Sequence, residues 1–373
     1  RRLLLNFRLS MIFKCDLNRH FEKAGYKISS LEEIHTSGAT QCQYFSLLLR
    51  DGGKRFIKIG EKVDFEIRNL NYLAGIDFAE SPRVLAGSNS ERKILVMNYA
   101  TIPSLGYDMI RLFNKGSVSI DDLLVMQEGA FDFLGKLYLL SSDKKILPYP
   151  QSLHERVSLS LAMLRNLKGT SIIDGHQIDL SKIVDIPICI TDSGSFPISI
   201  RDMCLRLRHL IIDSDETSVR KIIHADFQPP NIVGDENRAI RVIDFTDMVY
   251  SGNPCWDLGK WSNYIKRFHR VAELRALGQD EDRQIIFHKP TEFFFLEDKN
   301  RVPTDFLLIE EDARRKFRNI SGLSEAEIVT VGLLSEFIVN VYTLNRHCVF
   351  YPHTIKNVLM YIRESYQKVV DQI

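Results

Sequence analysis

Residues 221–245 read KIIHADFQPPNIVGDENRAIRVIDF, and this stretch combines two apolar runs with polar residues at their ends. His224, Asp226 and Asn231 follow the first run, and Asp244 ends the second. Each apolar run predicts a short buried strand, and the GDEN sequence between them predicts a turn. A strand–turn–strand return would let Asp226, Asn231 and Asp244 converge on one site.

The loop that carries Asp226 is stiff, because the prolines at 229–230 exclude both helix and continued strand. Asn231 and Asp244 supply hard oxygen ligands, which suit a Mg²⁺ ion that completes its shell with phosphate oxygens and water. Asp226 then remains to orient a substrate hydroxyl and to accept its proton. This set of residues predicts phosphoryl transfer.

Phosphoryl transfer also requires a cation that holds the nucleotide phosphates. Lys58 lies within the apolar strand RFIKIG, where an unpaired ammonium would be costly, and Glu66 on the following predicted helix is a candidate partner. The segment TSGATQ at 36–41, with Ser37 and Gly38, is expected to cover phosphates with backbone amides. The sequence has no G-x-x-x-x-G-K-[ST] motif, which disfavours a P-loop enzyme.

The bulk composition indicates a folded protein with two lobes. The chain has 373 residues, of which 45% are hydrophobic and 26% charged, and its net charge is +1. This charge gives no indication of bulk nucleic-acid binding, and no later run approaches the roughly 18 apolar residues of a membrane helix. Six scattered cysteines without a C-x-x-C pair indicate a reduced, cytoplasmic protein, although three disulfides are arithmetically allowed.

The first twenty residues resemble a signal peptide only faintly, because Asn6 and Arg8 break the apolar stretch. We expect Met11 to lie nearer the natural start, with residues 1–10 as an extension. The oligomeric state is expected to be a monomer or a homodimer.

Hydrophobic periodicity predicts a small β-rich lobe over residues 1–100 and a larger, mainly helical lobe over 101–373, so the fold class is α+β. The small lobe is predicted as an antiparallel sheet of about five strands with one helix. Helices are predicted at 14–28, 62–75, 119–141, 151–167, 201–214, 255–270 and most of 323–373; strands at 32–60 (three) and 81–100 (two). Residues 168–200 and the aromatic segment 288–300 are left unplaced.

The chain resembles the aminoglycoside phosphotransferase and choline kinase superfamily, whose members are small-molecule kinases with a protein-kinase-like fold. HADFQPPN is similar to that family's H-x-D-x-x-x-x-N loop, and VIDFTD to its I-D-F/W-[DE] segment. GNPCWDLGKW resembles the family's G-x-P-x-x-D-L-A element, and ILVMNYA resembles the strand that leads to the adenine hinge. The similar segments follow the family's order from about residue 30 to 265.

The resemblance implies an ATP- or GTP-dependent, Mg²⁺-requiring kinase, with roles for specific residues. Asp226 would be the catalytic base, Asn231 and Asp244 would bind the metal, Lys58 would bind phosphates and Glu66 would orient Lys58. His224 and Asp257 would support the loop. The nucleotide would also contact Ser37, Gly38, the gate Met97, and the hinge residues Asn98, Tyr99 and Ala100; Asp247, Trp256 and Trp261 are acceptor-site candidates.

The acceptor is a small-molecule hydroxyl compound, and its identity is left open among antibiotics, choline or ethanolamine, sugars and amino alcohols. Gln228 stands where the family commonly has His, and Pro230 where it commonly has Gly, so the loop beside Asp226 departs from the family's usual pattern. For Trp256 and Trp261, core packing is the competing interpretation to an aromatic cage for a quaternary amine. Two other functions are weighed: a non-catalytic nucleotide-binding protein of the same fold, and a metal-dependent phosphoesterase.

Overall fold

The chain divides into two compact units, which are described separately. The small unit consists of Arg1–Ser104 and Ile232–Thr246, and the large unit of Leu105–Asn231 and Asp247–Ile373. The computed structural model describes residues 19, 21–23, 25–34, 43–60, 62–78, 81–82, 84–86, 94–97, 120–140, 152–173, 176–190, 196–217, 219–234, 240–276, 285–286, 293–295, 304–350 and 355–372.

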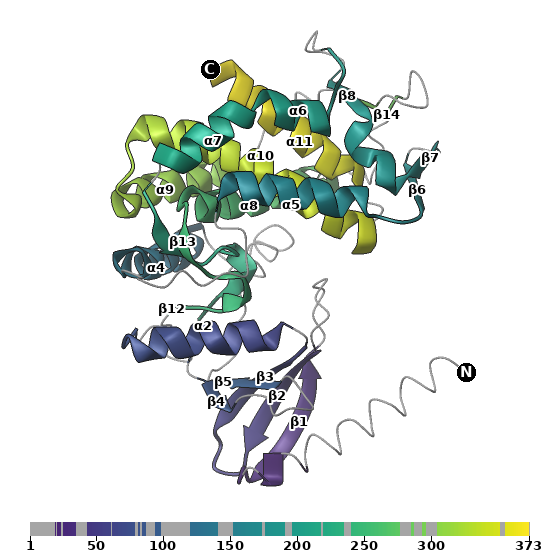
Figure 1. Cartoon of the computed structure of the whole chain (residues 1–373). Helices are drawn as coiled ribbons and strands as arrows, with labels where there is room; N and C mark the ends of the chain where they lie inside the picture. The colour runs from purple at the N-terminus through teal and green to yellow at the C-terminus, as the bar shows by residue number, and fades with distance from the viewer. Residues whose placement is uncertain are drawn as a thin grey trace, which may run out of the picture. The chain divides into compact units, whose positions relative to one another are not determined.

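The small unit contains a five-stranded antiparallel sheet with the strand order β1-β2-β3-β5-β4 (Figure 1). Its one long helix, α2, lies between β3 and β4 in the chain. The predicted number of strands, the helix and the α+β fold class are confirmed. The bounds are β1 Ile28–Ile34, β2 Gln43–Leu49, β3 Lys54–Ile59, α2 Val63–Gly75, β4 Val84–Ala86 and β5 Ile94–Met97.

The helix predicted at 14–28 ends earlier than its periodicity suggested, because β1 already begins at Ile28. Gly25 has φ +89° and its amide donates to the carbonyl of Glu22, while the amide of Tyr26 donates to the carbonyl of Phe21. This pair of hydrogen bonds around a left-handed glycine is a Schellman motif, which terminates helices. Of the predicted helix, Arg19 and residues 21–23 are helical, whereas residues 25–27 are not and Ile28 belongs to β1.

The hydrophobic core on one face of the sheet is formed by apolar residues that alternate with more exposed residues along the strands. Phe45, Leu47 and Leu49 are buried every second residue on β2, as expected for a strand with one face toward a core. They form a cluster with Ile57 of β3 and residues of β5. The tight return from β2 to β3 is made at residues 50–53, where Gly52 adopts φ +85°, as the DGG signal predicted.

The strands near the quoted stretch pair differently from the prediction. The run before His224, β10 (Lys221–Ile223), pairs with β13 (Val249–Gly252), and the hairpin is formed instead by β11 (Ile232–Gly234) and β12 (Ile240–Val242). The apolar IVG after Asn231 supplies a local partner for β12, and a short loop closes at lower entropic cost than a long one. β11 and β12 belong to the small unit, whereas the sequence assigned them to the larger lobe.

The large unit is built around helix α10, which packs against α8, α11 and α5. By length and composition, α10 would be apolar enough to cross a membrane over Glu325–Val349, but 67% of that window is buried, so it is a core helix. The helix bounds are α4 Ile120–Leu139, α5 Leu153–Arg165, α6 Ile200–Arg206, α7 Arg208–Thr217, α8 Cys255–Ala276, α9 Thr304–Ser321, α10 Glu325–Phe350 and α11 Ile355–Gln372.

The two segments that the sequence left unplaced meet in one four-stranded sheet, with the order β14-β15-β8-β9. β15 (Phe293–Phe295), from the aromatic segment, runs parallel to β8 (Pro187–Ile190). The other strands are β9 (Ile198–Ser199) and β14 (Ile285–Ile286), and β6 (Thr170–Ile173) with β7 (His176–Asp179) forms a separate hairpin. Such non-local pairing leaves no signal within either segment.

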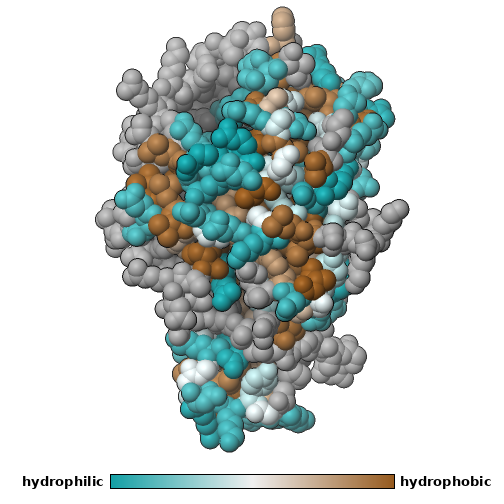
Figure 2. Space-filling view, turned by 90° about the vertical axis from the view of Figure 1, so that its left-hand side faces the viewer, coloured by the Kyte–Doolittle hydropathy of each residue, from teal (hydrophilic) through white to brown (hydrophobic). Residues whose placement is uncertain are grey.

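The described surface carries scattered hydrophobic side chains. Val125 and Leu139 of α4, Ile172 of β6 and Phe196 before β9 are exposed, and they are spread over three separate parts of the chain. On the face shown in Figure 2, hydrophobic residues occur in small groups among hydrophilic ones. Isolated exposed apolar side chains are common on folded proteins and do not by themselves indicate a binding surface.

Candidate functional site

Lys58 is the centre of a buried polar cluster in the small unit. Its Nζ atom lies 2.7 Å from Oε2 of Glu66 and 2.7 Å from Oδ1 of Asp244, and 3.3 Å from Oγ1 of Thr246. Lys58 is 4% exposed and Glu66 is 1% exposed. The two carboxylates compensate an ammonium that would otherwise be costly to bury.

The charges of this cluster stabilise one another. Burial lowers the pKa of Lys58, but the carboxylates of Asp244 and Glu66 outweigh it and hold this pKa well above its usual range. Burial raises the pKa of the Glu66 carboxyl, and the neighbouring Lys58 ammonium acts in the opposite direction. Lys58 therefore stays charged at neutral pH.

Residues 244–246 are held against α2 by further hydrogen bonds. Asn69 Nδ2 donates to the carbonyl of Phe245 at 2.6 Å, and the amide of Phe245 donates to Oε1 of Glu66 at 3.3 Å. Thr246 Oγ1 lies 2.7 Å from Oδ1 of Asp244. These bonds explain why the segment from Ile232 to Thr246 clusters with the small unit. Sequence reasoning missed Asn69 and Thr246, although Thr246 lies only two residues after Asp244.

Asp244 has an unusual backbone conformation, and its side chain is partly exposed to solvent. Its φ is +65°, a conformation that costs free energy for a non-glycine residue and recurs at functional sites. Its side chain is 25% exposed, whereas that of Lys58 is 5% exposed. A ligand can therefore reach the Asp244 carboxylate more easily than the Lys58 ammonium.

In the large unit, the loop after β10 surrounds Asp226 with donors. Oδ2 of Asp226 accepts from Asn231 Nδ2 and from Gln228 Nε2, both at 3.0 Å, and Oδ1 accepts from Lys260 Nζ at 2.9 Å. Asn231 Nδ2 also donates to the carbonyl of Asp226 at 2.8 Å. The structure thus brings Asp226 and Asn231 together, and it adds Gln228 and Lys260 as partners.

Asp257, at the start of α8, fastens this loop to the helical body. Its carboxylate accepts from the amides of His224 at 3.1 Å and Ala225 at 2.7 Å, and from the hydroxyl of Tyr138 at 3.1 Å. Burial raises the pKa of Asp257, while His224 and these hydrogen bonds act in the opposite direction. Ala225 has φ +65°, so the loop is held in a costly conformation just before Asp226.

His224 points into the same loop rather than outward. It is 0% exposed, and its Nδ1 atom accepts a hydrogen bond of 3.3 Å from the amide of Asp226. This contact ties the imidazole to the turn that presents Asp226. A bracing position of this kind is what the resemblance implied for His224.

Trp256 and Trp261 are buried, which favours core packing over the alternative of an aromatic cage in an acceptor site. Both are 0% exposed. The guanidinium of Arg156 lies 4.0 Å from the Trp256 ring, and Trp261 stacks on Phe227 with the ring centroids 5.0 Å apart. Both rings therefore pack in the core. This close packing helps to fix the neighbouring loop that carries Asp226.

Asp247 is half-buried in the large unit. Its charge acts on Arg156, where it raises the pKa of a guanidinium whose pKa is lowered mainly by burial. Met97, the last residue of β5, is 1% exposed and pairs with Phe56 and Val84. The predicted nucleotide contacts at 37–38 and 98–100 lie outside the described residues.

Each unit, taken by itself, offers an oxygen atom of the kind that Mg²⁺ binds. The part of the chain that the structure describes contains no group of three or more His, Cys, Asp or Glu residues that could form a closed metal site. Asn231 uses its amide nitrogen for Asp226, so its amide oxygen is the atom suited to a cation, and Asp244 offers a half-exposed carboxylate. Few protein oxygens are typical of Mg²⁺ that is shared with substrate phosphates.

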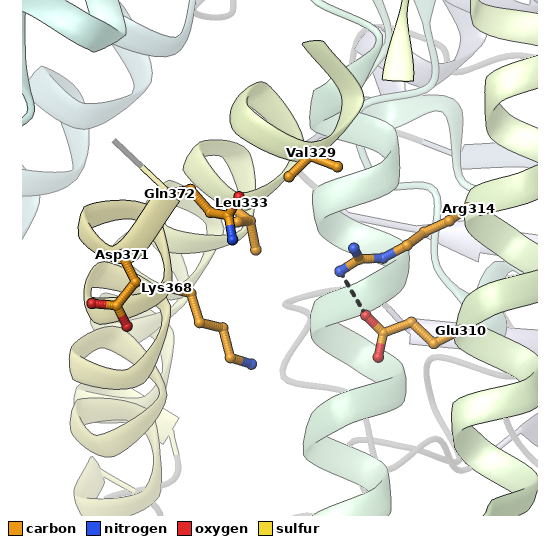
Figure 3. Close-up of a pocket in the computed structure, with 7 residues that line it drawn as sticks. All are labelled: Glu310, Arg314, Val329, Leu333, Lys368, Asp371 and Gln372. Carbon is orange, nitrogen blue, oxygen red and sulfur yellow. Dashed lines mark hydrogen bonds and ion pairs between the residues drawn. The ribbon is translucent and has the colours of Figure 1, made fainter. Parts of the chain in front are cut away.

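A pocket of about 360 Å³ lies apart from these residues, between α9, α10 and α11 (Figure 3). Arg314 and Glu310 of α9 form an ion pair of 2.9 Å at its wall, and Lys368 of α11 points toward it from the other side. Its remaining lining residues are Val329, Leu333, Asp371 and Gln372. None of the predicted site residues lines this pocket.

Comparison with known proteins identifies the fold. No family model matches the chain, and no curated protein matches its sequence. Among solved structures, an ethanolamine kinase of Plasmodium vivax aligns with a TM-score of 0.54 and 10% identity over 92% of this chain and 83% of that one. The choline kinase LicA of Streptococcus pneumoniae aligns with a TM-score of 0.52 and 12% identity over 98% of both chains.

An ADP-bound aminoglycoside phosphotransferase, APH(2'')-Ib, aligns with a TM-score of 0.52 and 12% identity over 96% of this chain and 98% of that one. At these identities the likeness concerns the fold. The chain therefore has the protein-kinase-like fold of these solved structures, and the predicted fold is confirmed.

Proposed function

We propose that this chain is a small-molecule kinase that transfers the γ-phosphoryl group of ATP or GTP to a hydroxyl group. The observation that carries the proposal is the buried Lys58, which is held at 2.7 Å by carboxylates from two separate segments, Glu66 and Asp244. A buried strand lysine that pairs with a glutamate of the following helix is the arrangement that binds nucleotide phosphates in kinases of this fold. The fold supports the same reading, since its structural neighbours are named as kinases.

In the small unit, we assign Lys58 to the nucleotide phosphates and Glu66 to its orientation. Thr246 keeps Asp244 in position through their hydrogen bond. Asn231 and Asp244 would hold Mg²⁺, which, when bound, neutralises the charge of the phosphate groups. The remaining nucleotide contacts are proposed at Ser37, Gly38, Met97, Asn98, Tyr99 and Ala100.

In the large unit, we assign Asp226 to the acceptor. Its carboxylate is fixed by Asn231 and Gln228, so it is pre-oriented to accept a hydrogen bond from the acceptor hydroxyl and to receive its proton. Asp257 and His224 hold the loop that presents Asp226. The protein is proposed to act in the cytoplasm as a monomer or homodimer, without nucleic acid or membrane partners.

The proposal is tested by measuring transfer of labelled γ-phosphate from ATP and from GTP to a panel of hydroxyl compounds. We expect Asp226→Asn to lower the rate of transfer by a factor of about 10² to 10⁴, because the variant cannot accept the proton. Nucleotide affinity should stay unchanged, because Asp226 is not among the residues proposed to contact the nucleotide. Glu128→Gln, at a largely exposed carboxylate of α4, is the matched control.

Two outcomes would contradict this function. Mg²⁺-dependent nucleotide binding without transfer to any acceptor would indicate a non-catalytic nucleotide-binding protein. Hydrolysis of phosphomonoesters without any nucleotide would indicate a phosphoesterase, a function for which the Lys58–Glu66 ion pair has no evident use. Full transfer by Asp226→Asn would show that the role given to Asp226 is wrong.

A further inference from the structure

A lysine contacts the proposed catalytic aspartate directly. Lys260 lies on α8, three residues after Asp257, and its Nζ atom is 2.9 Å from Oδ1 of Asp226. The side chains are 8% and 15% exposed, respectively, so water screens this ion pair only weakly. The carboxylate that would receive the acceptor hydroxyl is therefore already paired with a fixed cation of the protein.

The other oxygen of Asp226 is also occupied by donors. Gln228 and Asn231 both donate to Oδ2, and the ammonium of Lys260 lies over the Tyr342 ring at 5.0 Å. The two amide groups fix the Asp226 carboxylate, and Lys260 lies between this carboxylate and the Tyr342 ring. A charge introduced beside the acceptor hydroxyl would consequently meet the Lys260 ammonium at short range.

A second buried cation, Arg156, shares the Trp256 ring with Lys260. The Trp256 ring centroid is 4.0 Å from the guanidinium of Arg156 and 5.9 Å from the ammonium of Lys260. Arg156 is 5% exposed, and its Nη2 atom has no hydrogen-bond partner among the described residues. Burial lowers the pKa of Arg156, whereas the carboxylates of Asp247, Asp257 and Glu155 all raise it.

We propose that Lys260 selects the acceptor, favouring a hydroxyl compound that carries a carboxylate or phosphate close to the reacting hydroxyl and disfavouring amino alcohols. The proposal rests on the kinase function proposed above and names the acceptor class for the same site. Asp226 alone would attract a cationic acceptor, but its charge is balanced by Lys260. The pair is neutral overall, so an acceptor ammonium gains no net attraction from it, whereas an anionic group that lies nearer to Lys260 than to Asp226 is attracted.

The preference can be measured with four acceptors built on one carbon skeleton: glycerol, glycerate, glycerol 3-phosphate and 3-amino-1,2-propanediol. Binding is measured by calorimetry on the full chain with Mg²⁺ and a non-hydrolysable ATP analogue, and phosphoryl transfer is measured with ATP. We expect an anionic member to bind at least about tenfold more tightly than the amine, as a single charge interaction at a partly buried site allows. Glycerate and glycerol 3-phosphate distinguish a carboxylate from a phosphate.

Substitutions at Lys260 then test whether this residue is the cause. Lys260→Gln should reduce the ratio of anion to amine affinity by about tenfold, because it removes one charge but keeps a donor to Asp226. Lys260→Arg should retain the preference. Lys316→Gln, at a largely buried lysine of α9 that pairs with Glu128 and Asp312, is the control that should leave the ratio unchanged.

Several results would overturn the inference. Equal binding of the anion and the amine, tighter binding of the amine, or no binding of either anion at tens of millimolar would each do so. An equal loss of transfer to all acceptors in Lys260→Gln, with an unchanged ratio, would show that Lys260 serves the reaction rather than the choice of acceptor. If the chain does not bind the nucleotide analogue at all, the kinase function itself is contradicted, which is a separate readout.

Discussion

Lys58 shows how one side chain depends on residues that are far apart in the sequence. Glu66 follows it by 8 residues, so a strand and the next helix bring them together, but Asp244 lies 186 residues away. The first partner could be predicted from local spacing. The second was predicted by motif alone, and its direct ion pair with Lys58 appears only in the folded unit.

Replacing Lys58 should destabilise the small unit. Lys58→Met leaves Glu66 buried with an uncompensated charge, which typically costs about 3–5 kcal/mol of unfolding free energy. Urea unfolding followed by circular dichroism measures this loss. Lys54→Met, at an exposed lysine of the same strand, is the control and should change stability by less than about 0.5 kcal/mol.

The double variant Lys58→Met with Glu66→Gln should recover part of the loss, because it removes the buried negative charge as well. Similar stabilities of Lys58→Met and Lys54→Met would contradict the ion-pair interpretation.

The contribution of Lys58 should not vary with pH in the neutral range. The folded-state pKa of Lys58 is raised above its unfolded value of about 10.4. Its stabilisation is therefore complete below that unfolded value and is lost only as the pH rises through the folded value. We expect the difference in unfolding free energy between the wild type and Lys58→Met to be the same at pH 7 and pH 9; a marked fall between these pH values would contradict the raised pKa.

At the scale of elements, helices α8 and α10 approach closely at a glycine. A Cβ atom on Gly259 would lie 2.9 Å from the backbone carbon of Ser335 and 3.1 Å from the amide nitrogen of Glu336. Such contacts are with backbone and cannot be relieved by a rotamer change. Because Asp257 and Lys260 flank Gly259 on the same helix, this close packing also sets the positions of two residues beside the Asp226 loop.

We expect Gly259→Ala to destabilise the protein by about 1–3 kcal/mol and to lower phosphoryl transfer, because the helices must separate to fit the methyl group. Gly332→Ala on α10 is a matched control, since its Cβ would lie 3.5 Å from Leu258, an ordinary contact distance. That variant should be neutral or more stable by up to about 1 kcal/mol, because alanine favours helix over glycine. Thermal unfolding of both proteins measures the contrast, and equal effects would contradict the packing argument.

The sequence predicted elements well where one segment carries its own periodicity. The alternation on β2 and the apolar face of α2 place both elements within a few residues of their observed bounds. The prediction from sequence failed where a strand pairs with a segment far away in the chain, as β10 does with β13 and β8 with β15. Periodicity records which face of a segment is buried, but it does not record which other segment buries it.

At the scale of the whole molecule, the reactivity of the cysteine thiols shows whether the core of the large unit is folded. The three described thiols whose surroundings are known, Cys204, Cys255 and Cys348, are free and buried, as predicted for isolated cysteines. Burial raises the pKa of Cys204 and Cys348 to about 12, and it raises that of Cys255 further. At pH 8 roughly one thiol in ten thousand would be ionised at such a pKa, so these groups should be unreactive.

We expect iodoacetamide at pH 8 to leave Cys204, Cys255 and Cys348 unmodified in the folded protein and to modify all three in denaturant, as read by peptide mass spectrometry. Because they lie on α6, α8 and α10, a cooperative large unit should expose them over the same denaturant range. Ile172→Cys, at a position that is 74% exposed, supplies a thiol that should react in the folded state. Rapid native labelling of any of the three buried thiols would contradict their placement in the core.

The amino-acid sequence by itself determined the α+β fold class, the five-stranded sheet with its helix, and a set of candidate site residues that includes Lys58, Asp226 and Asp244. These features depend on local periodicity and on short motifs, which can be recognised in the sequence without the structure. Only the tertiary structure decided that Lys260 pairs with Asp226 and that Trp256 and Trp261 belong to the core. Both outcomes depend on which side chains of separate segments face each other, and that is fixed by packing between elements.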